Sequence, residues 1–226
     1  MERSGGRETA ASPEKGSLRE RALGEAASTL AFQQGLAWRY AKLMDACGKR
    51  EHIFDRVFNF GPLLMDGRVL PPVIRWAGNG EARSVEASYR IVRPAAIVTR
   101  APTWRDYLMT GVPETENRPA ILPATQAEKK AWKRGVTEGW AAGAAAADEL
   151  FSVNMNRLVA DYRGILRFRM LARRGMVSLP VLAEGRLAVR VEKRTLDVGE
   201  TTFRISVPAE FRDMENWSSG TDGREE

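Results

Sequence analysis

Apolar residues recur every three or four positions along two long stretches of the chain, which is the spacing of a helix with one buried face. In the first stretch, Ser17 with Glu20 three residues later forms a capping-box pattern, and Gly48 suits the end of a helix. The apolar positions between them are Leu23, Ala26, Leu30, Ala37, Tyr40, Leu43, Met44 and Cys47. The pattern therefore predicts a helix over about 18–47.

The second stretch opens on another capping box, Thr125 with Glu128, and predicts a helix over about 125–174 that would be roughly 75 Å long. Gly164 is where we expect a kink or a break. Its apolar positions are Trp132, Val136, Trp140, Ala144, Ala147, Phe151, Met155, Leu158, Tyr162 and Ile165. Three glycines four residues apart, which predict the close approach of another backbone, are Gly135, Gly139 and Gly143.

Between the two stretches the pattern is less regular. It predicts a short helix around Ile53–Phe58, which Gly61-Pro62 would break. The segment 70–74 must be extended, because residues that precede proline avoid the α region. Residues 85–99 alternate as one or two strands, with Pro94 at a bulge or an edge.

After Gly175 the pattern changes to the alternation of strands. Turns are expected at Glu184-Gly185 and at Gly199-Glu200. The alternating apolar residues are Leu187, Val189, Val191, Leu196, Val198, Phe203, Ile205 and Val207. The whole pattern indicates an α+β fold in which two long helices pack with a small, mainly antiparallel β-sheet. We expect a disordered segment at 1–17, one domain at 18–207 and an acidic tail at 208–226.

Composition narrows the classes of function. The 226 residues are 43% hydrophobic and 28% charged, as in a soluble globular protein, and no apolar run approaches the roughly 20 residues of a membrane span. With one cysteine and one histidine, an intrachain disulfide and a zinc site of the usual cysteine/histidine kind are excluded. We expect Cys47 to be a buried thiol and His52 a surface imidazole.

The net charge of +6 is unevenly distributed. The tail from Pro208 carries six acidic residues against two arginines. The segment from Phe151 to Gly175 contains six arginines and a single acidic residue, Asp161. A basic patch there would bind nucleic acid, anionic lipid or an acidic protein. Alternatively, these cations only complement the C-terminal end of a long helix. The six are Arg157, Arg163, Arg167, Arg169, Arg173 and Arg174.

Phosphate-binding loops and a nucleophile elbow are absent from the sequence. The candidate catalytic group that remains lies in one short stretch, "APTWRDYLMT" at 101–110. Thr103 and Asp106, three apart, predict instead a helix start whose residues cap each other. Consecutive helical residues point about 100° apart, so Arg105, Asp106 and Tyr107 cannot converge on one atom. We therefore predict a helix start, or a docking surface, and no catalysis, cofactor or metal.

Several segments, in order, resemble the DotC/TraI family of type IVB secretion and IncI-type conjugation systems. They are "GLAWRYAKLMD" (35–45), "FDRVFNFGPLLMDGRVLPPVI" (54–74), "YRIV" (89–92), "APTWRDYL" (101–108), "ILPATQAEKKAWKRGVTEGWAAG" (121–143) and "LFSVNMNRLVADYRGILRFRMLARRGMVSLP" (150–180). The resemblance implies a structural, non-enzymatic lipoprotein on the periplasmic side of the outer membrane. It would build a ring-shaped core complex with DotD-like and DotH-like subunits, for export of DNA or effector proteins.

The residues that we single out as an interaction or structural motif come from these segments. They are Trp38, Arg39, Pro71, Pro72, Trp104, Arg105, Asp106, Tyr107, Gly139 and Trp140. The alternative function is a basic nucleic-acid-binding module that uses the arginine-rich helix end at 157–174. Family members carry a signal peptide that ends at an acylated cysteine. Cys47 follows no apolar stretch, so acylation is not carried over to it, and we expect either a signal upstream of Met1 or another route to the periplasm.

Overall fold

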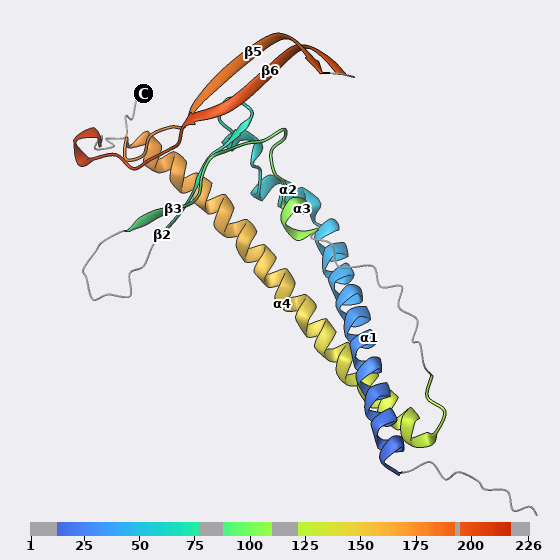
Figure 1. The fold of residues 1–226 in the computed structure, drawn as a ribbon. Helices are drawn as coiled ribbons and strands as arrows, with labels where there is room; N and C mark the ends of the chain where they lie inside the picture. Colours follow the sequence, from blue (N-terminus) through green and yellow to red (C-terminus); the bar gives the residue numbers. More distant parts are fainter. Residues whose placement is uncertain (1–12, 77–87, 110–121, 193–194, 218–226) are drawn as a thin grey trace, which may run out of the picture. The chain divides into compact units, whose positions relative to one another are not determined.

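The computed structural model describes residues 13–76, 88–109, 122–192 and 195–217 (Figure 1). The α+β class is confirmed. The predicted segments at 1–17, 85–99 and 208–226 lie partly outside these described residues. The elements follow in the order α1 (Pro13–Gly48), α2 (Glu51–Val57), η1 (Gly61–Leu63), β1 (Val69–Leu70), β2 (Val73–Trp76), β3 (Tyr89–Arg93), β4 (Ala96–Ile97), α3 (Trp104–Leu108), α4 (Gln126–Arg173), β5 (Val181–Glu192), β6 (Thr195–Val207) and η2 (Met214–Asn216).

The chain divides into two compact units. Unit 1 combines Met1–Arg50 with Leu108–Asn154, and unit 2 combines Glu51–Tyr107 with Met155–Glu226. Helix α4 therefore contributes its first part to unit 1 and its second part to unit 2. The single domain that the sequence predicts over 18–207 stays a prediction.

Unit 1 is a pair of helices in direct backbone contact. A Cβ added to Gly135 would lie 2.2 Å from the carbonyl oxygen of Gly24. At Gly139 and Gly143 it would lie 2.1 Å from the carbonyl oxygens of Ser28 and Phe32. Each pair is separated by the same number of residues, so α1 and this part of α4 run in the same direction (Figure 1). The close approach predicted from the glycine spacing is confirmed.

The sequence predicts the start of α4 correctly but places the start of α1 too late. At α4, the Glu128 N–H donates to Thr125 Oγ1 (3.2 Å) and the Thr125 N–H donates to Glu128 Oε2 (3.1 Å), so the capping box is confirmed. Helix α1 begins at Pro13, before the predicted cap at Ser17. Proline suits a first helical turn because it has no N–H to leave unpaired and its φ is already helical.

Gly164 does not break α4, which is continuous over Gln126–Arg173, so the expected break is wrong. A Cβ at Gly164 would lie 2.4 Å from Val73 Cγ1 and 3.1 Å from the carbonyl oxygen of Ile74. The glycine thus allows strand β2 to lie directly on the helix. A glycine lowers helix stability by only about 1 kcal/mol relative to alanine, which a helix this long tolerates.

The strands form three separate antiparallel pairs, β1–β4, β2–β3 and β5–β6. Within β5–β6 the two predicted turns are wrong, because both strands run through them without interruption. Gly185 pairs with Thr202, and Leu187 pairs with Glu200. A Cβ at Gly185 would lie 2.8 Å from Thr202 Oγ1, so this glycine makes room for the facing strand rather than for a turn.

Unit 2 has its core where β2 and β3 meet the second part of α4. Asp161 is 4% exposed and accepts from Arg75 Nη2 (3.2 Å) and Arg93 Nη1 (2.8 Å), one arginine on each strand. Pro71 and Pro72, between β1 and β2, are fully buried, which agrees with a structural role. One cluster of buried apolar residues there consists of Ile74, Phe168, Leu171, Val177 and Ala209.

Alanine normally stabilises a helix relative to glycine, but at the close helix contact we expect it to destabilise the fold. Gly139→Ala should lower the free energy of unfolding by about 1–3 kcal/mol, because the methyl group meets backbone that must move away. Gly48 has no atom within 4 Å of an added Cβ, so Gly48→Ala should be neutral or stabilising by up to about 1 kcal/mol. Urea unfolding followed by circular dichroism measures both. Equal responses of the two variants would contradict the close contact.

Loss of the buried Asp161 carboxylate should destabilise the fold more than loss of an exposed one. Asp161→Asn should lower the free energy of unfolding by about 3 kcal/mol, because it leaves two arginines without their counter-charge. Asp148, which pairs with Arg39 at the surface, is the matched control, and Asp148→Asn should lower it by less than about 1 kcal/mol. The same urea titration compares them. An Asp161→Asn variant as stable as Asp148→Asn would show that the two strands do not depend on this carboxylate.

Candidate functional site

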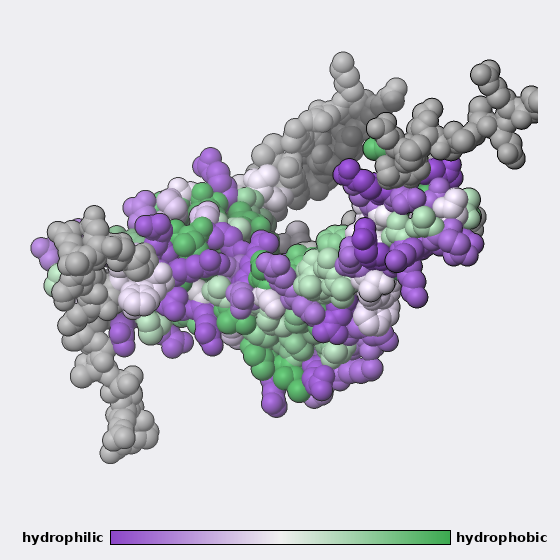
Figure 2. Space-filling model, turned by 90° about the horizontal axis from the view of Figure 1, so that it is seen from below, coloured by the Kyte–Doolittle hydropathy of each residue, from purple (hydrophilic) through white to green (hydrophobic). Residues whose placement is uncertain are grey.

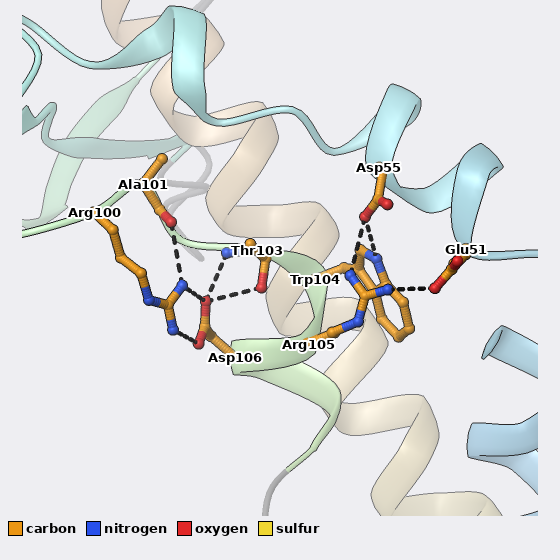
Figure 3. A network of polar contacts seen from close by, with 8 residues as sticks. All are labelled: Glu51, Asp55, Arg100, Ala101, Thr103, Trp104, Arg105 and Asp106. Atoms are coloured by element: carbon orange, nitrogen blue, oxygen red, sulfur yellow. Dashed lines mark hydrogen bonds and ion pairs between the residues drawn. The ribbon is translucent and has the colours of Figure 1, made fainter.

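Helix α3 begins with the predicted cap, in a modified form (Figure 3). Asp106 Oδ2 accepts from the Thr103 N–H at 2.7 Å, as the capping box requires. The Thr103 hydroxyl, however, donates to the same oxygen at 3.0 Å instead of accepting from the Asp106 N–H. That N–H donates to the Thr103 carbonyl oxygen at 3.1 Å. One half of the predicted reciprocal pair is thus confirmed.

Arg100 completes this cap. Its guanidinium binds both carboxylate oxygens of Asp106, at 2.8 Å for Nη1 to Oδ2 and by a short contact of Nη2 to Oδ1. Nη1 also donates to the Ala101 carbonyl oxygen at 3.3 Å (Figure 3). Hydrogen bonding from Arg100 is the largest cause that lowers the pKa of Asp106 from 3.8 to about 2. Sequence reasoning missed Arg100, because its position just before Pro102 matches no helical spacing.

On the other side of α3, two residues reach the acidic side chains of α2 (Figure 3). Trp104 Nε1 donates to Asp55 Oδ1 at 2.7 Å. Arg105 donates to the same oxygen at 3.2 Å and to Glu51 Oε2 at 2.6 Å. The Arg105 guanidinium lies 4.4 Å from the Trp104 ring centroid. We call these four residues, Glu51, Asp55, Trp104 and Arg105, the α2–α3 latch.

Tyr107 points into the interior of unit 2. It is 9% exposed, and its ring stacks on Phe60 with centroids 5.9 Å apart. Burial is the main cause that raises the pKa of Tyr107. Arg105, Asp106 and Tyr107 therefore bind three different sets of partners, as their helical spacing predicts. Chemically, the arrangement neutralises charge and fixes α3 to its neighbours.

The other candidate residues of unit 1 form a surface aromatic pair. Trp38 and Trp140 lie with ring centroids 5.5 Å apart and remain 47% and 37% exposed. Beside them on α1, Arg39 Nε contacts Asp148 Oδ1 at 2.9 Å. Gly139 lies under α1 and is a packing position rather than part of the surface. Large hydrophobic residues reach the surface elsewhere too, between hydrophilic ones, as Figure 2 shows for one face.

The six arginines of the predicted basic patch do not form one surface. Arg167 donates to the Ile74 carbonyl oxygen and Arg169 to that of Pro62, both at 2.8 Å, so these two hold unit 2 together. The Arg157 guanidinium lies 6.0 Å from the Tyr107 ring centroid. Four of the six are exposed: Arg157, Arg163, Arg173 and Arg174.

Cys47 and His52 are as predicted, a buried thiol and an exposed imidazole. Burial raises the pKa of the Cys47 thiol. Within residues 13–76, 88–109, 122–192 and 195–217 there is no cluster of three or more His, Cys, Asp or Glu residues that could bind a metal. None of the helices in those ranges is both long enough and apolar enough to cross a membrane.

Comparison with known proteins gives one result. A family model described as type IV secretory system, conjugal DNA-protein transfer (T4SS_TraI) matches residues 17–219. The match includes all of α4 and nearly all of α1, and it confirms the resemblance inferred from the sequence segments. No curated protein matches the chain.

The Asp106 cap predicts a pH-dependent stability. Because the pKa of Asp106 is lower in the folded chain than its ordinary value of 3.8, the ionised group stabilises the fold fully above about pH 4. This contribution is lost as the pH falls through about 2. Asp106→Asn should therefore reduce the free energy of unfolding at pH 7 and make little difference at the acid end.

Urea unfolding at pH 7 and at acid pH measures that difference. Glu149→Gln, at an exposed position of α4, is the control for removing a carboxylate. A gap between wild type and Asp106→Asn that stays constant with pH would contradict the role of the ionised carboxylate.

Proposed function

The chain belongs to the TraI family of type IV secretory, conjugal DNA-protein transfer components, and from this premise we propose that it is a scaffold subunit of an outer-membrane core complex. In this role it binds other subunits and supports the export of DNA or effector proteins. The proposal includes no catalytic step. The family match over residues 17–219 carries it, because the match extends over both units instead of one short motif.

The geometry of the candidate motif agrees with a structural role. The polar side chains of α3 are held by Arg100, Thr103 and the acidic residues of α2, so they serve to position the segment. A scaffold needs such fixed surfaces, because ordering flexible side chains on binding reduces affinity. Conjugal transfer through a type IV system is the setting that the family supplies.

We assign a partner-binding role to the surface aromatic pair, Trp38 and Trp140. Tryptophan is enriched among the residues that dominate binding energy at protein interfaces. The partners in this proposal are DotD-like and DotH-like subunits, on the periplasmic side of the outer membrane, in a ring-shaped assembly. The nucleic-acid alternative has less support than the sequence suggested, because two of its six arginines donate to backbone carbonyls of unit 2.

Co-purification tests this function. An affinity-tagged chain, expressed in donor cells that carry its own transfer system, should retain the other two subunits after detergent solubilisation of the envelope. Trp38→Ser should reduce that retention by about tenfold or more, as loss of a central tryptophan does at other interfaces. Val153→Ser, at a position of α4 that is 57% exposed, is the matched control and should leave it unchanged. A tagged chain that retains neither subunit would refute the scaffold role.

A further inference from the structure

The exposed face of α4 near its C-terminal end carries both arginines and apolar side chains. At about 100° per residue, four of its positions, 163, 166, 170 and 173, share an arc of about 80° on this helix. Arg174 follows directly after the last helical residue, and its N–H donates to the Met170 carbonyl oxygen at 3.3 Å. Leu166 and Met170 are 42% and 41% exposed. We call the five residues the basic stripe: Arg163, Leu166, Met170, Arg173 and Arg174. Among the described residues, the three arginines have no side-chain hydrogen bond or ion pair.

A second surface of unit 2 has the opposite charge and the same mixed character. Three acidic and three apolar residues lie along it, with Arg212 and Asn216 between them. All six are exposed: Glu210, Phe211, Asp213, Met214, Glu215 and Trp217. We call it the acidic segment. Phe211, Met214 and Trp217 are 45%, 74% and 43% exposed. Its three carboxylates have no hydrogen bond or ion pair with any described residue.

The acidic segment is held in place by backbone hydrogen bonds. The Ser178 N–H donates to the Glu210 carbonyl oxygen at 2.8 Å, and the Arg212 N–H donates to that of Met176 at 3.0 Å. Trp217 Nε1 closes the segment on the Arg212 carbonyl oxygen at 2.9 Å. A surface fixed in this way loses little conformational entropy when it binds a partner.

We propose that the acidic segment of one copy of this chain docks on the basic stripe of a second copy. Three carboxylates and three apolar side chains would meet three guanidinium groups and two apolar side chains. These groups do not pair with one another inside one chain, so each surface presents its charges to a second copy. The apolar contacts contribute affinity, and the charges contribute orientation and a fast association rate. This inference deepens the proposed scaffold function and rests on it for its role in the cell.

Such an interface is head-to-tail, because it joins two different surfaces. Every copy then offers one free surface of each kind, and the contact repeats until a ring closes or a filament grows. The exposed charges make the association sensitive to salt, since the Debye length falls from about 10 Å at 0.1 M to about 3 Å at 1 M ionic strength.

Analytical ultracentrifugation of the purified full chain tests this inference without the transfer system. At low salt we expect assembly that rises with concentration and weakens at high salt. Arg173→Glu with Arg174→Glu should raise the apparent dissociation constant at least tenfold. Asp213→Lys with Glu215→Lys should do the same from the other surface. Lys129→Glu with Lys130→Glu, exposed at the start of α4, is the control for net charge and should assemble as wild type.

The mixture of the two charge-reversed proteins gives the sharpest outcome. Each should be monomeric alone with an unchanged circular dichroism spectrum, and the two together should assemble, because each reversed surface now matches the other. Any of three results would overturn the inference: a wild type that is monomeric at low salt, unchanged assembly of the variants, or no recovery on mixing. Salt-sensitive DNA binding lost by the arginine variant, with no self-association in the wild type, would assign the stripe to nucleic acid instead.

Discussion

Backbone contact with one long helix is the constraint on which both units depend. Helix α4 has glycines where another segment must come within reach of its main chain. In unit 1 these are Gly135, Gly139 and Gly143, which lie under the carbonyl oxygens of α1. In unit 2, Gly164 does the same for strand β2. At such distances a Cα–H can contact a carbonyl oxygen directly, a weak interaction that recurs at close helix pairs. Even one methyl group at these positions would force the segments apart.

Carboxylates hold the remaining elements to this framework. Glu128 caps the start of α4 and binds Arg19 at 2.9 Å, Asp106 caps α3 through Thr103 and Arg100, and Asp161 joins β2 and β3 to α4. Hydrogen bonds from the backbone of Ala124 and Thr125 lower the pKa of Glu128. Asp106 and Glu128, whose pKa values are lowered, therefore stay ionised at neutral pH and make charge-assisted hydrogen bonds. These charges fix the elements of the fold to one another, which agrees with the structural role that we propose.

The sequence predicted those features that depend on residues close together in the chain. The two long helices, the Thr125 cap and the extended segment around Pro71 follow from residues a few positions apart. The role of a glycine at 164 or 185 depends on which strand faces it, and that partner is distant in sequence. For the same reason the α2–α3 latch was missed, since Asp55 and Trp104 are brought together only by the fold. The sequence does not distinguish the arginines near the end of α4 from one another. In the structure, two of them donate to backbone carbonyl oxygens and the others are exposed to solvent.

We propose that this chain supports a transfer complex by structure rather than by chemistry. Sedimentation of the complex from donor cells that lack the chain tests it most directly. We expect that the remaining subunits no longer sediment as one high-mass assembly, that plasmid transfer falls to background, and that the chain supplied in trans restores both. An intact high-mass assembly in cells that have lost transfer would contradict it, because the chain would then act on a complex that it does not build.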